Sequence, residues 1–397
     1  MAKTIYVDNA ATTAMSDTAI AAMARYYKEV YGNPSSLHTV GQIAKEALVR
    51  ARAEIAACIG AKPNEIYFTS GGSEADNQAI RSAAYGGLAK GKKHIISTAF
   101  EHHAVLHTLK KLEKEGFEVT YLNVHSHGNI TAGEVEAAIR PDTALVTVMY
   151  ANNEVGSVLP VREIGEVCRA HKVIFHTDAV QAVGHIPVNV ISDNIDMLSC
   201  SAHKFHGPKG VGFLYCRTGV ALQNLIEGGA QERNRRAGTE NLAGISGMAA
   251  ALKEAVANLE KNMKREAALR DRLIAGLTKV EHSRLNGDRV NRLPNNVNIC
   301  FEGVEGESLL LLLDAKGICA SSGSACTSGS LDPSHVLLAL GLPHEVAHGS
   351  LRLSLSEYNT EEEVDFIIEE VPKVVEYLRS ISPVWEELEK GERPHLI

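Results

Sequence analysis

A lysine and an aspartate each follow a predicted strand of this chain. Lys204 comes shortly after the apolar run 197–200 and is surrounded by small residues, histidines and a Gly-Pro turn. Taken alone, it is equally compatible with an ordinary loop lysine. Asp178 closely follows the predicted strand 173–176, and Gln181 lies three positions after Asp178. Because ligands of open α/β sheets bind beyond the carboxyl ends of the strands, Asp178 and Lys204 can face one cavity.

These two groups suit one cofactor chemistry. Pyridoxal 5'-phosphate needs an amine that forms a Schiff base with it and a carboxylate that keeps its pyridine nitrogen protonated. Its phosphate needs a seat, and the segment 68–74, Phe-Thr-Ser-Gly-Gly-Ser-Glu, predicts a strand, a glycine turn and then a helix. Backbone N–H groups at such a helix start bind anions. The turn alone is a weak signal, but with Asp178 and Lys204 it predicts a coherent cofactor site.

The cysteines raise a second question of chemistry. They are odd in number, widely spaced and never in a C-x-x-C pair, which argues against a disulfide framework and against a zinc ribbon. Most should be buried free thiols. The seven are Cys58, Cys168, Cys200, Cys216, Cys300, Cys319 and Cys326.

Cys326 differs from the other six in its setting. No bulky side chain occurs between Ser321 and Ser330, and this composition predicts a mobile, exposed loop. Cys319 lies seven positions away in the predicted strand 318–320, and we expect it to be structural.

Composition limits the classes of function. A chain of 397 residues with 45% hydrophobic residues exceeds the size of one core, so we expect two domains. A net charge of −8 provides no basic surplus for nucleic acid or an anionic membrane. The apolar run 309–313 is far shorter than the roughly 20 residues of a membrane span. With no signal peptide recognised, we expect a cytoplasmic protein that acts on small molecules.

The histidines do not predict a metal centre. Seventeen are present, but none forms a recognised metal-binding motif such as H-E-x-x-H. We therefore expect no metal site.

The elements that must position these residues follow an alternating order. Between about residues 16 and 215, helical patterns alternate with short β-branched runs, which predicts a doubly wound α/β fold with a mostly parallel sheet. One helix should run from Ser16 to Tyr31, and a second should bury Ile43, Ala47, Ala51, Ile55 and Ile59. The seven predicted strands are 66–69, 94–97, 119–122, 144–149, 173–176, 197–200 and 211–215.

Beyond Glu240 the pattern changes. A long helical stretch is followed by apolar runs at 296–301, 318–320 and 351–354, which suggest a smaller α+β unit. A last helix covers 361–380, and Pro372 should kink or end it. We predict a large cofactor-binding domain at 16–255 and a small domain made of 1–15 and 256–397.

Seven motifs together resemble one family. With the segment DNAATT at 8–13 before them and Arg352 after them, they cover nearly the whole chain. The chain resembles the cysteine desulfurases of the nitrogen-fixation and iron–sulfur-assembly branch, which belong to the class-V aminotransferase-like enzymes of pyridoxal phosphate fold type I. The motifs are GNPSSLH at 32–38, TSGGSE at 69–74, NNEVG at 152–156, DAVQ at 178–181, HK at 203–204, RAGTEN at 236–241 and SGSAC at 322–326.

The resemblance implies a role for each matching residue. Lys204 would bind the cofactor and move protons, Asp178 would pair with the pyridine nitrogen, and Gln181 would bond the ring oxygen. His102, rather than its neighbour His103, would stack on the ring and take part in proton transfer. Asn153 and Arg352 would hold the substrate carboxylate. The phosphate would be held by Gly72, Ser73, Ser201 and His203, with Thr239 reaching over from a second subunit.

The resemblance also implies an activity. The enzyme would convert L-cysteine to L-alanine, and the Cys326 thiolate would take the sulfur as a persulfide and pass it to an acceptor protein such as an iron–sulfur scaffold. A homodimer follows from the role of Thr239. Two alternatives remain open: a selenocysteine lyase or related class-V aminotransferase, and a non-catalytic scaffold for sulfur assembly. An aminotransferase would not need the Cys326 loop.

Overall fold

A mostly parallel sheet of seven strands forms the larger part of the molecule. The computed structural model describes residues 4–322 and 333–397. The strands lie in the order β2-β8-β7-β6-β5-β3-β4. Their bounds are β2 Ile66–Thr69, β3 His94–Thr98, β4 Glu118–Leu122, β5 Thr143–Thr147, β6 Ile174–Asp178, β7 Met197–Ser201 and β8 Gly212–Cys216.

The direction of the strands brings the predicted site residues to one edge. Only β8 runs against its neighbours in this sheet, and it pairs antiparallel with both β2 and β7. The other pairs are parallel. The carboxyl ends of β2, β3, β5, β6 and β7 therefore lie at the same edge of the sheet.

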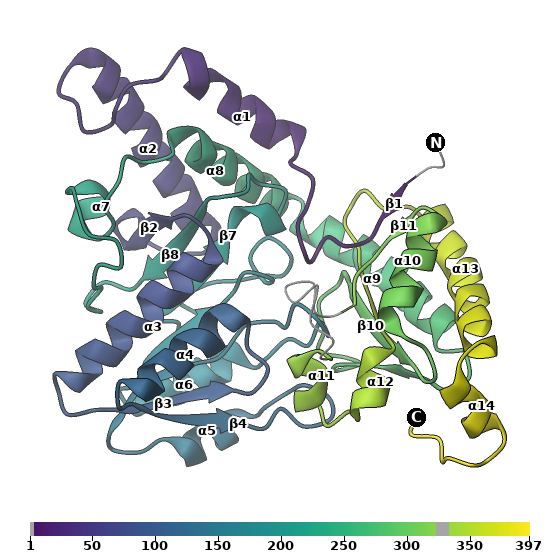
Figure 1. Ribbon diagram of the computed structural model, residues 1–397. Coiled ribbons are helices and arrows are strands. Elements are labelled where there is room, and N and C mark those ends of the chain that lie inside the picture. The colour runs from purple at the N-terminus through teal and green to yellow at the C-terminus, as the bar shows by residue number, and fades with distance from the viewer. Residues whose placement is uncertain (1–3, 323–332) are drawn as a thin grey trace.

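Helices cover both faces of this sheet (Figure 1). Neighbouring residues of one strand point to opposite faces, and Ile95 and Ile96 of β3 pack into two different cores. The core on one face includes residues of α3 and α4, and the core on the other includes residues of α2, α6 and α8. These helices are α1 Asp17–Lys28, α2 Thr39–Cys58, α3 Gly72–Leu88, α4 His103–Lys114, α5 Ala132–Ala138, α6 Val161–Ala170, α7 Gln231–Asn234 and α8 Leu242–Ala257.

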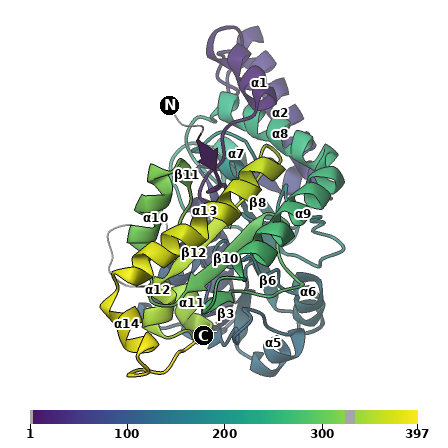
Figure 2. The same ribbon diagram turned by 90° about the vertical axis from the view of Figure 1, so that its right-hand side faces the viewer.

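The second unit has a core of its own. Its three-stranded antiparallel sheet has the order β12-β10-β9, and β1 pairs in parallel with β11 beside it. Figure 2 shows α13 crossing in front of these strands. The strands are β1 Ile5–Tyr6, β9 Ser283–Leu285, β10 Asn296–Phe301, β11 Ile318–Cys319 and β12 Ser350–Ser354. The helices are α9 Leu259–Leu277, α10 Gly306–Ala315, α11 His335–Ala339, α12 His344–His348, α13 Glu361–Ser380 and α14 Pro383–Glu389.

The division into two domains remains a proposal. Two separate hydrophobic cores support it. Ile5 and Val7, which belong to the predicted segment 1–15, pack in the core formed by residues 269–378 and not in the cores of the large sheet. The break between α8 and α9 at Asn258 lies next to the predicted boundary. However, Val336 of α11 packs into the core of the large sheet, so this part of the chain spans both units.

Two local expectations need correction. The side chain of Ile43 is 45% exposed, and α2 buries Gly41 and Ala44 there instead. The first helix ends at Lys28 rather than Tyr31. The last helix spans 361–380 as expected, so Pro372 does not end it, and a kink at Pro372 stays a prediction. Among the described helices, none is both long and apolar enough to cross a membrane.

Candidate active site

A cavity of about 630 Å³ lies at the carboxyl edge of the large sheet. Its walls come from the residues that follow β2, β3, β5, β6 and β7, from the N-terminal segment 10–12, and from β12 of the second unit. Side chains far apart in sequence therefore share one space. The predicted site residues that line it are Lys204, Asp178, Gln181, His102, Gly72, Ser73, Ser201, His203, Asn153 and Arg352.

The side chain of Lys204 is hydrogen-bonded to the N-terminal segment. It ends a single 3-10 turn, η2 (Ala202–Lys204), directly after β7. Its Nζ donates hydrogen bonds to the carbonyl oxygens of Ala10 at 2.6 Å and Ala11 at 2.8 Å. Gln181 Nε2 donates to the same Ala10 oxygen at 3.0 Å. In Figure 1 this segment runs from β1 of the second unit to α1 of the first.

Asp178 is a buried carboxylate among other buried carboxylates. Its Oδ1 accepts a hydrogen bond from the Val180 N–H at 2.9 Å. Burial raises the pKa of Asp178 to about 6, although the Val180 N–H and the charge of Lys204 oppose the rise. Asp76 of α3 is also fully buried, and burial and the neighbouring Asp178 raise its pKa well above the usual range. A cationic partner would favour the ionised form of Asp178.

His102 lies next to this pair. Its Nδ1 accepts a hydrogen bond from the Ala104 N–H at 3.1 Å, so it caps the start of α4. Ligand atoms of His102, Asp178 and Asp76 lie within 4.8 Å of one another. Burial, followed by the charge of Lys204, lowers the pKa of His102 to about 4. The imidazole is therefore neutral near pH 7 and can accept or donate a proton. His103 also lines the cavity.

The start of α3 offers a seat for an anion. Its N-cap Gly71 provides no side-chain hydrogen bond to the first-turn N–H groups. Gly71 has φ +153°, a conformation that favours glycine, and a Cβ on Gly72 would lie 2.6 Å from Val180 Cγ2. The donor set also includes the side chains of Ser73, Ser201 and His203 along the same wall. These groups fit a phosphate.

Arg352 closes the cavity from the second unit. Its guanidinium is buried and pairs with Asp8 Oδ1 at 2.8 Å, and a second N–H donates to the Asn153 carbonyl oxygen at 3.2 Å. Its Nε has no hydrogen-bond partner among the described residues. A buried donor without a partner is costly, and a substrate carboxylate would satisfy it.

Two predicted site residues do not line this cavity. Thr239 is exposed and outside it. Cys326 lies outside the described residues. Nevertheless, described residues on both sides of the segment 323–332 contact residues that line the cavity. Ser321 exchanges backbone hydrogen bonds with Arg352 at 3.2 and 2.6 Å. The Ser334 hydroxyl donates to Glu154 Oε2, and Glu154 lines the cavity.

The other six cysteines are poor candidates for a nucleophile. None of the six, all of which are described, lines the cavity. Burial raises the pKa of Cys58 to about 11 and of Cys216 and Cys300 to about 12. Burial also raises the pKa of Cys168, Cys200 and Cys319. A thiol with a raised pKa contains little thiolate near neutral pH.

Several residues of this cavity could not be expected from the sequence. Glu154, whose pKa burial raises to about 7, links the cavity to the segment after Cys326. His335 Nε2 donates to the Glu101 carbonyl oxygen at 2.9 Å, and His335 lines the same cavity. Lys209 adds a positive charge near His203. Only tertiary packing brings these residues together, although the NNEVG motif at 152–156 includes Glu154.

Comparison with known proteins identifies the family. The family model for class-V aminotransferases matches residues 5–367. The chain belongs to the class-V aminotransferase family. Among class-V relatives, the cysteine desulfurase IscS of Methanosarcina thermophila is 54% identical over 96% of this chain and 94% of its own length. The cysteine desulfurase IscS of Clostridium botulinum strain Hall is 52% identical over 99% of both chains.

A solved structure of a NifS-like protein confirms the fold. It superimposes with a TM-score of 0.88 at 39% identity, and the match covers 94% of this chain and 100% of that one. The predicted α/β fold of the class-V enzymes, with its mostly parallel seven-stranded sheet, is therefore confirmed.

Proposed function

We propose that the protein is a cysteine desulfurase that converts L-cysteine to L-alanine and retains the sulfur as a persulfide on Cys326. The observation that carries this proposal is the meeting of Lys204, Asp178, His102 and Arg352 in one cavity. The names of its full-length relatives support the same activity.

Pyridoxal 5'-phosphate fits this cavity. When bound, it supplies an electron sink for the charge left at the substrate Cα after proton loss. The carboxylate of Asp178 would hold the proton of the pyridine nitrogen, and Gln181 would face the ring oxygen. The N-terminus of α3, with Ser201 and His203, would hold the phosphate. Thr239 of a second subunit would complete this seat.

Lys204 and His102 would move protons. Two backbone carbonyl oxygens hold Lys204 Nζ in the cavity. This amine would bind the cofactor covalently, and once released it would remove the proton from the substrate Cα. His102 is neutral near pH 7 and close to Asp178, so it can stack on the ring and exchange a proton with the substrate.

Arg352 and Asn153 would hold the substrate carboxylate. A guanidinium binds a carboxylate through two parallel N–H donors, and Arg352 retains an unsatisfied Nε in a buried setting. Its position on β12, next to Ser321, joins substrate binding to the base of the segment that carries Cys326.

Cys326 would act as the sulfur acceptor. Its thiolate would attack the substrate sulfur and form an S–S bond with it as the substrate Cβ–S bond breaks. The electron pair of the broken bond would stay with the carbon skeleton, where Cβ takes a proton to become the methyl group of alanine and Cα regains the proton it had lost. Described residues on both sides of the segment that carries Cys326 contact residues that line the cavity, which supports this role.

The partners are proposals of the same kind. A persulfide must leave the enzyme, so we propose a thiol-containing acceptor protein such as an iron–sulfur scaffold. We also propose a homodimer, because Thr239 lies outside the cavity of its own chain. A cytoplasmic location stays a prediction.

The test compares single-cysteine variants. Cys326→Ser should keep the visible absorption of the bound cofactor but lower alanine and sulfide formation from L-cysteine with a reductant by at least about 100-fold. Cys319→Ser is the matched control and should retain the wild-type rate. Lys204→Ala should lose the absorption that borohydride removes from the wild type. An unchanged rate in Cys326→Ser would refute the role of Cys326.

A further inference from the structure

Two histidines and one glutamate meet near the C-terminus, away from the proposed active site. Glu302 follows β10, His282 precedes β9, and His395 lies in the tail after α14. His395 Nδ1 lies 2.8 Å from Glu302 Oε2, and His282 Nδ1 lies 3.7 Å from the same oxygen. The ligand atoms of all three lie within 4.8 Å of one another. In Figures 1 and 2 the C-terminus lies beside α12.

Two of these side chains stand on a rigid frame. The Arg379 guanidinium donates to the carbonyl oxygens of Glu302 at 2.9 Å and His282 at 3.1 Å. The Glu302 N–H donates to the His282 carbonyl oxygen at 3.0 Å. Arg379 itself packs on Trp385, 3.9 Å from the ring centroid. These bonds hold the main chain of Glu302 and His282 independently of the tail residues 391–397.

The tail completes the cluster. The Leu396 N–H donates to Glu302 Oε1 at 2.6 Å, and the rings of His282 and His395 stack with centroids 3.6 Å apart. Glu302 is 4% exposed, yet it also lines a second cavity of about 490 Å³. Glu305 and Glu345 line that cavity as well, together with Arg393, which pairs with Glu345 at 2.9 Å. The cavity therefore gives a path by which a cation could reach Glu302.

We propose that His282, Glu302 and His395 bind a divalent transition metal of the zinc class and fasten the tail to the second unit. Two imidazoles and one carboxylate suit Zn²⁺ or Co²⁺, and water would supply the fourth ligand. Both rings would bind the metal through Nδ1. In His282 this nitrogen donates to the Ile397 carbonyl oxygen at 2.9 Å, so metal binding would replace that bond and move the ring proton to Nε2 through solvent. Zn–N and Zn–O bonds of 2.0–2.2 Å in a tetrahedron require ligand atoms roughly 3.4 Å apart. The two stacked rings need only tilt apart to reach this geometry.

Spacing alone does not reveal such a site. His282, Glu302 and His395 come from three separate segments, so no motif in the sequence contains them. The proposal therefore departs from the expectation, drawn from the sequence, that the chain has no metal site. The proposal also does not depend on the proposed function, because none of its residues lines the first cavity.

The test measures metal binding by the full-length protein. Titration of the metal-free protein with Zn²⁺ should show one equivalent per chain that His395→Ala and Glu302→Gln both lose, or bind at least about tenfold more weakly. The matched control is His125→Ala, which removes the histidine of an exposed pair with Glu134 at 2.6 Å that has no second imidazole. Equal binding by wild type and His395→Ala would overturn the proposal, as would equal loss in the control.

A second measurement checks the fastening of the tail. Bound Zn²⁺ should slow tryptic cleavage after Lys390 by at least about tenfold in the wild type and not in His395→Ala. The same rate with and without Zn²⁺ in the wild type would refute the fastening. A metal bound elsewhere, on a cysteine for example, would not distinguish the two proteins.

Discussion

The carboxyl group of Glu101 is fully buried, and its ionisation should make the free energy of unfolding depend on pH. Burial raises its pKa from the usual 4.5 to about 8. Because the pKa is higher in the folded protein, the folded state holds a proton between about pH 4.5 and 8 that the unfolded state has lost. The free energy of unfolding should therefore fall as pH rises through this window.

Glu101→Gln should remove this dependence. The amide keeps an acceptor for the Thr98 hydroxyl and the Met149 N–H but carries no charge. At pH 8 the variant should be more stable than the wild type by on the order of 1–3 kcal/mol, and near pH 5 the difference should shrink. Thermal unfolding at the two pH values measures it. Glu166→Gln on the exposed side of α6 is the control, and a pH-independent difference would contradict the prediction.

At the residue scale, the sequence predicted the groups that stand at the ends of strands. Lys204 and Asp178 follow runs whose apolar character predicts buried parallel strands, so their place at one edge could be inferred. Asp8 and Glu154 could not be found in this way. They act through Arg352 and Ser334, which are more than 170 positions away. Such contacts depend on how the two units pack against each other, and the hydrophobic periodicity of a sequence does not predict that packing.

At the scale of elements, α11 should control the base of the segment that carries Cys326. The Ser334 hydroxyl donates to Glu154 and accepts the N–H groups of Val336 and Leu337. Ser334→Ala removes all three bonds at a cost of about 1 kcal/mol for the lost cap. We expect alanine formation to fall about tenfold, as a misplaced reactive group lowers the rate, while the absorption of the bound cofactor stays unchanged.

Two further variants separate positioning from stability. Ser382→Ala removes the N-cap of α14, which is remote from the cavity, and should leave the rate unchanged. Ser334→Thr keeps a hydroxyl and should restore most of the activity. If Ser334→Ala and Ser382→Ala have equal rates, α11 does not position the segment.

The strands were easier to predict than the helix faces. All seven strands of the large sheet were expected, because β-branched runs between helices leave little ambiguity. The face of α2 was misjudged at Ile43, which lies one position before the buried Ala44. Alanine and glycine form much of the buried side of this helix. The positions of large apolar side chains therefore do not indicate which side is buried. Pro372 lies in a helix that continues past it, with Val371 and Val374 buried on either side.

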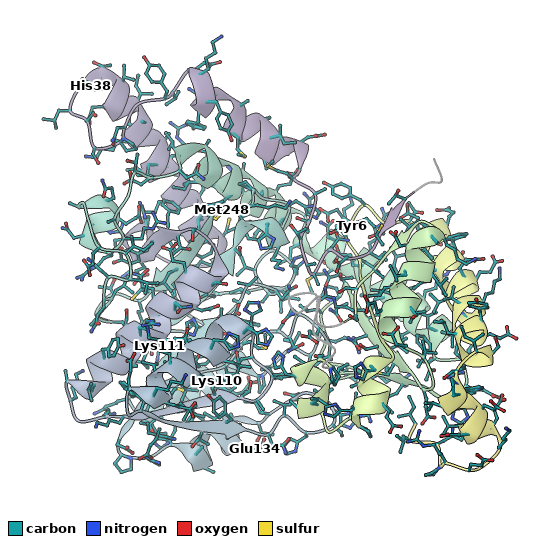
Figure 3. The ribbon with its side chains drawn as sticks, viewed as in Figure 1. Tyr6, His38, Lys110, Lys111, Glu134 and Met248 are labelled. Carbon is teal, nitrogen blue, oxygen red and sulfur yellow. The ribbon has the colours of Figure 1, made fainter. Side chains whose placement is uncertain are left out.

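At the scale of the whole molecule, exposed apolar side chains favour self-association. They occur on α1, on α2 and in the loop between them, and His38 marks the end of that loop in Figure 3. Several exposed apolar side chains on neighbouring elements are typical of a subunit interface. The exposed residues are Ile20, Tyr27, Tyr31, Leu37, Val40, Ile43 and Val49.

Leu37→Asp should therefore weaken the dimer. Light scattering should give about twice the 42.7 kDa chain mass for the wild type and a shift towards 42.7 kDa for the variant. Cofactor retention should fall as well, because Thr239 would no longer reach the partner's cavity. Val290→Asp is the matched control, since Val290 is 83% exposed and lies outside this region. A wild type that has the mass of one chain would contradict the dimer.

The N-terminal segment connects the second unit to the lysine of the cavity. Tyr6 lies where the two units meet in Figure 3, with its neighbour Ile5 paired to β11, whereas Ala10 and Ala11 contact Lys204. The few residues between these anchors span roughly 20 Å at most, so the tether has little slack. A rotation of the second unit that moves β1 would therefore shift the carbonyl oxygens that hold the lysine. This short segment, together with the direct contact between Arg352 and Asn153, couples the position of the second unit to the position of the Lys204 amine.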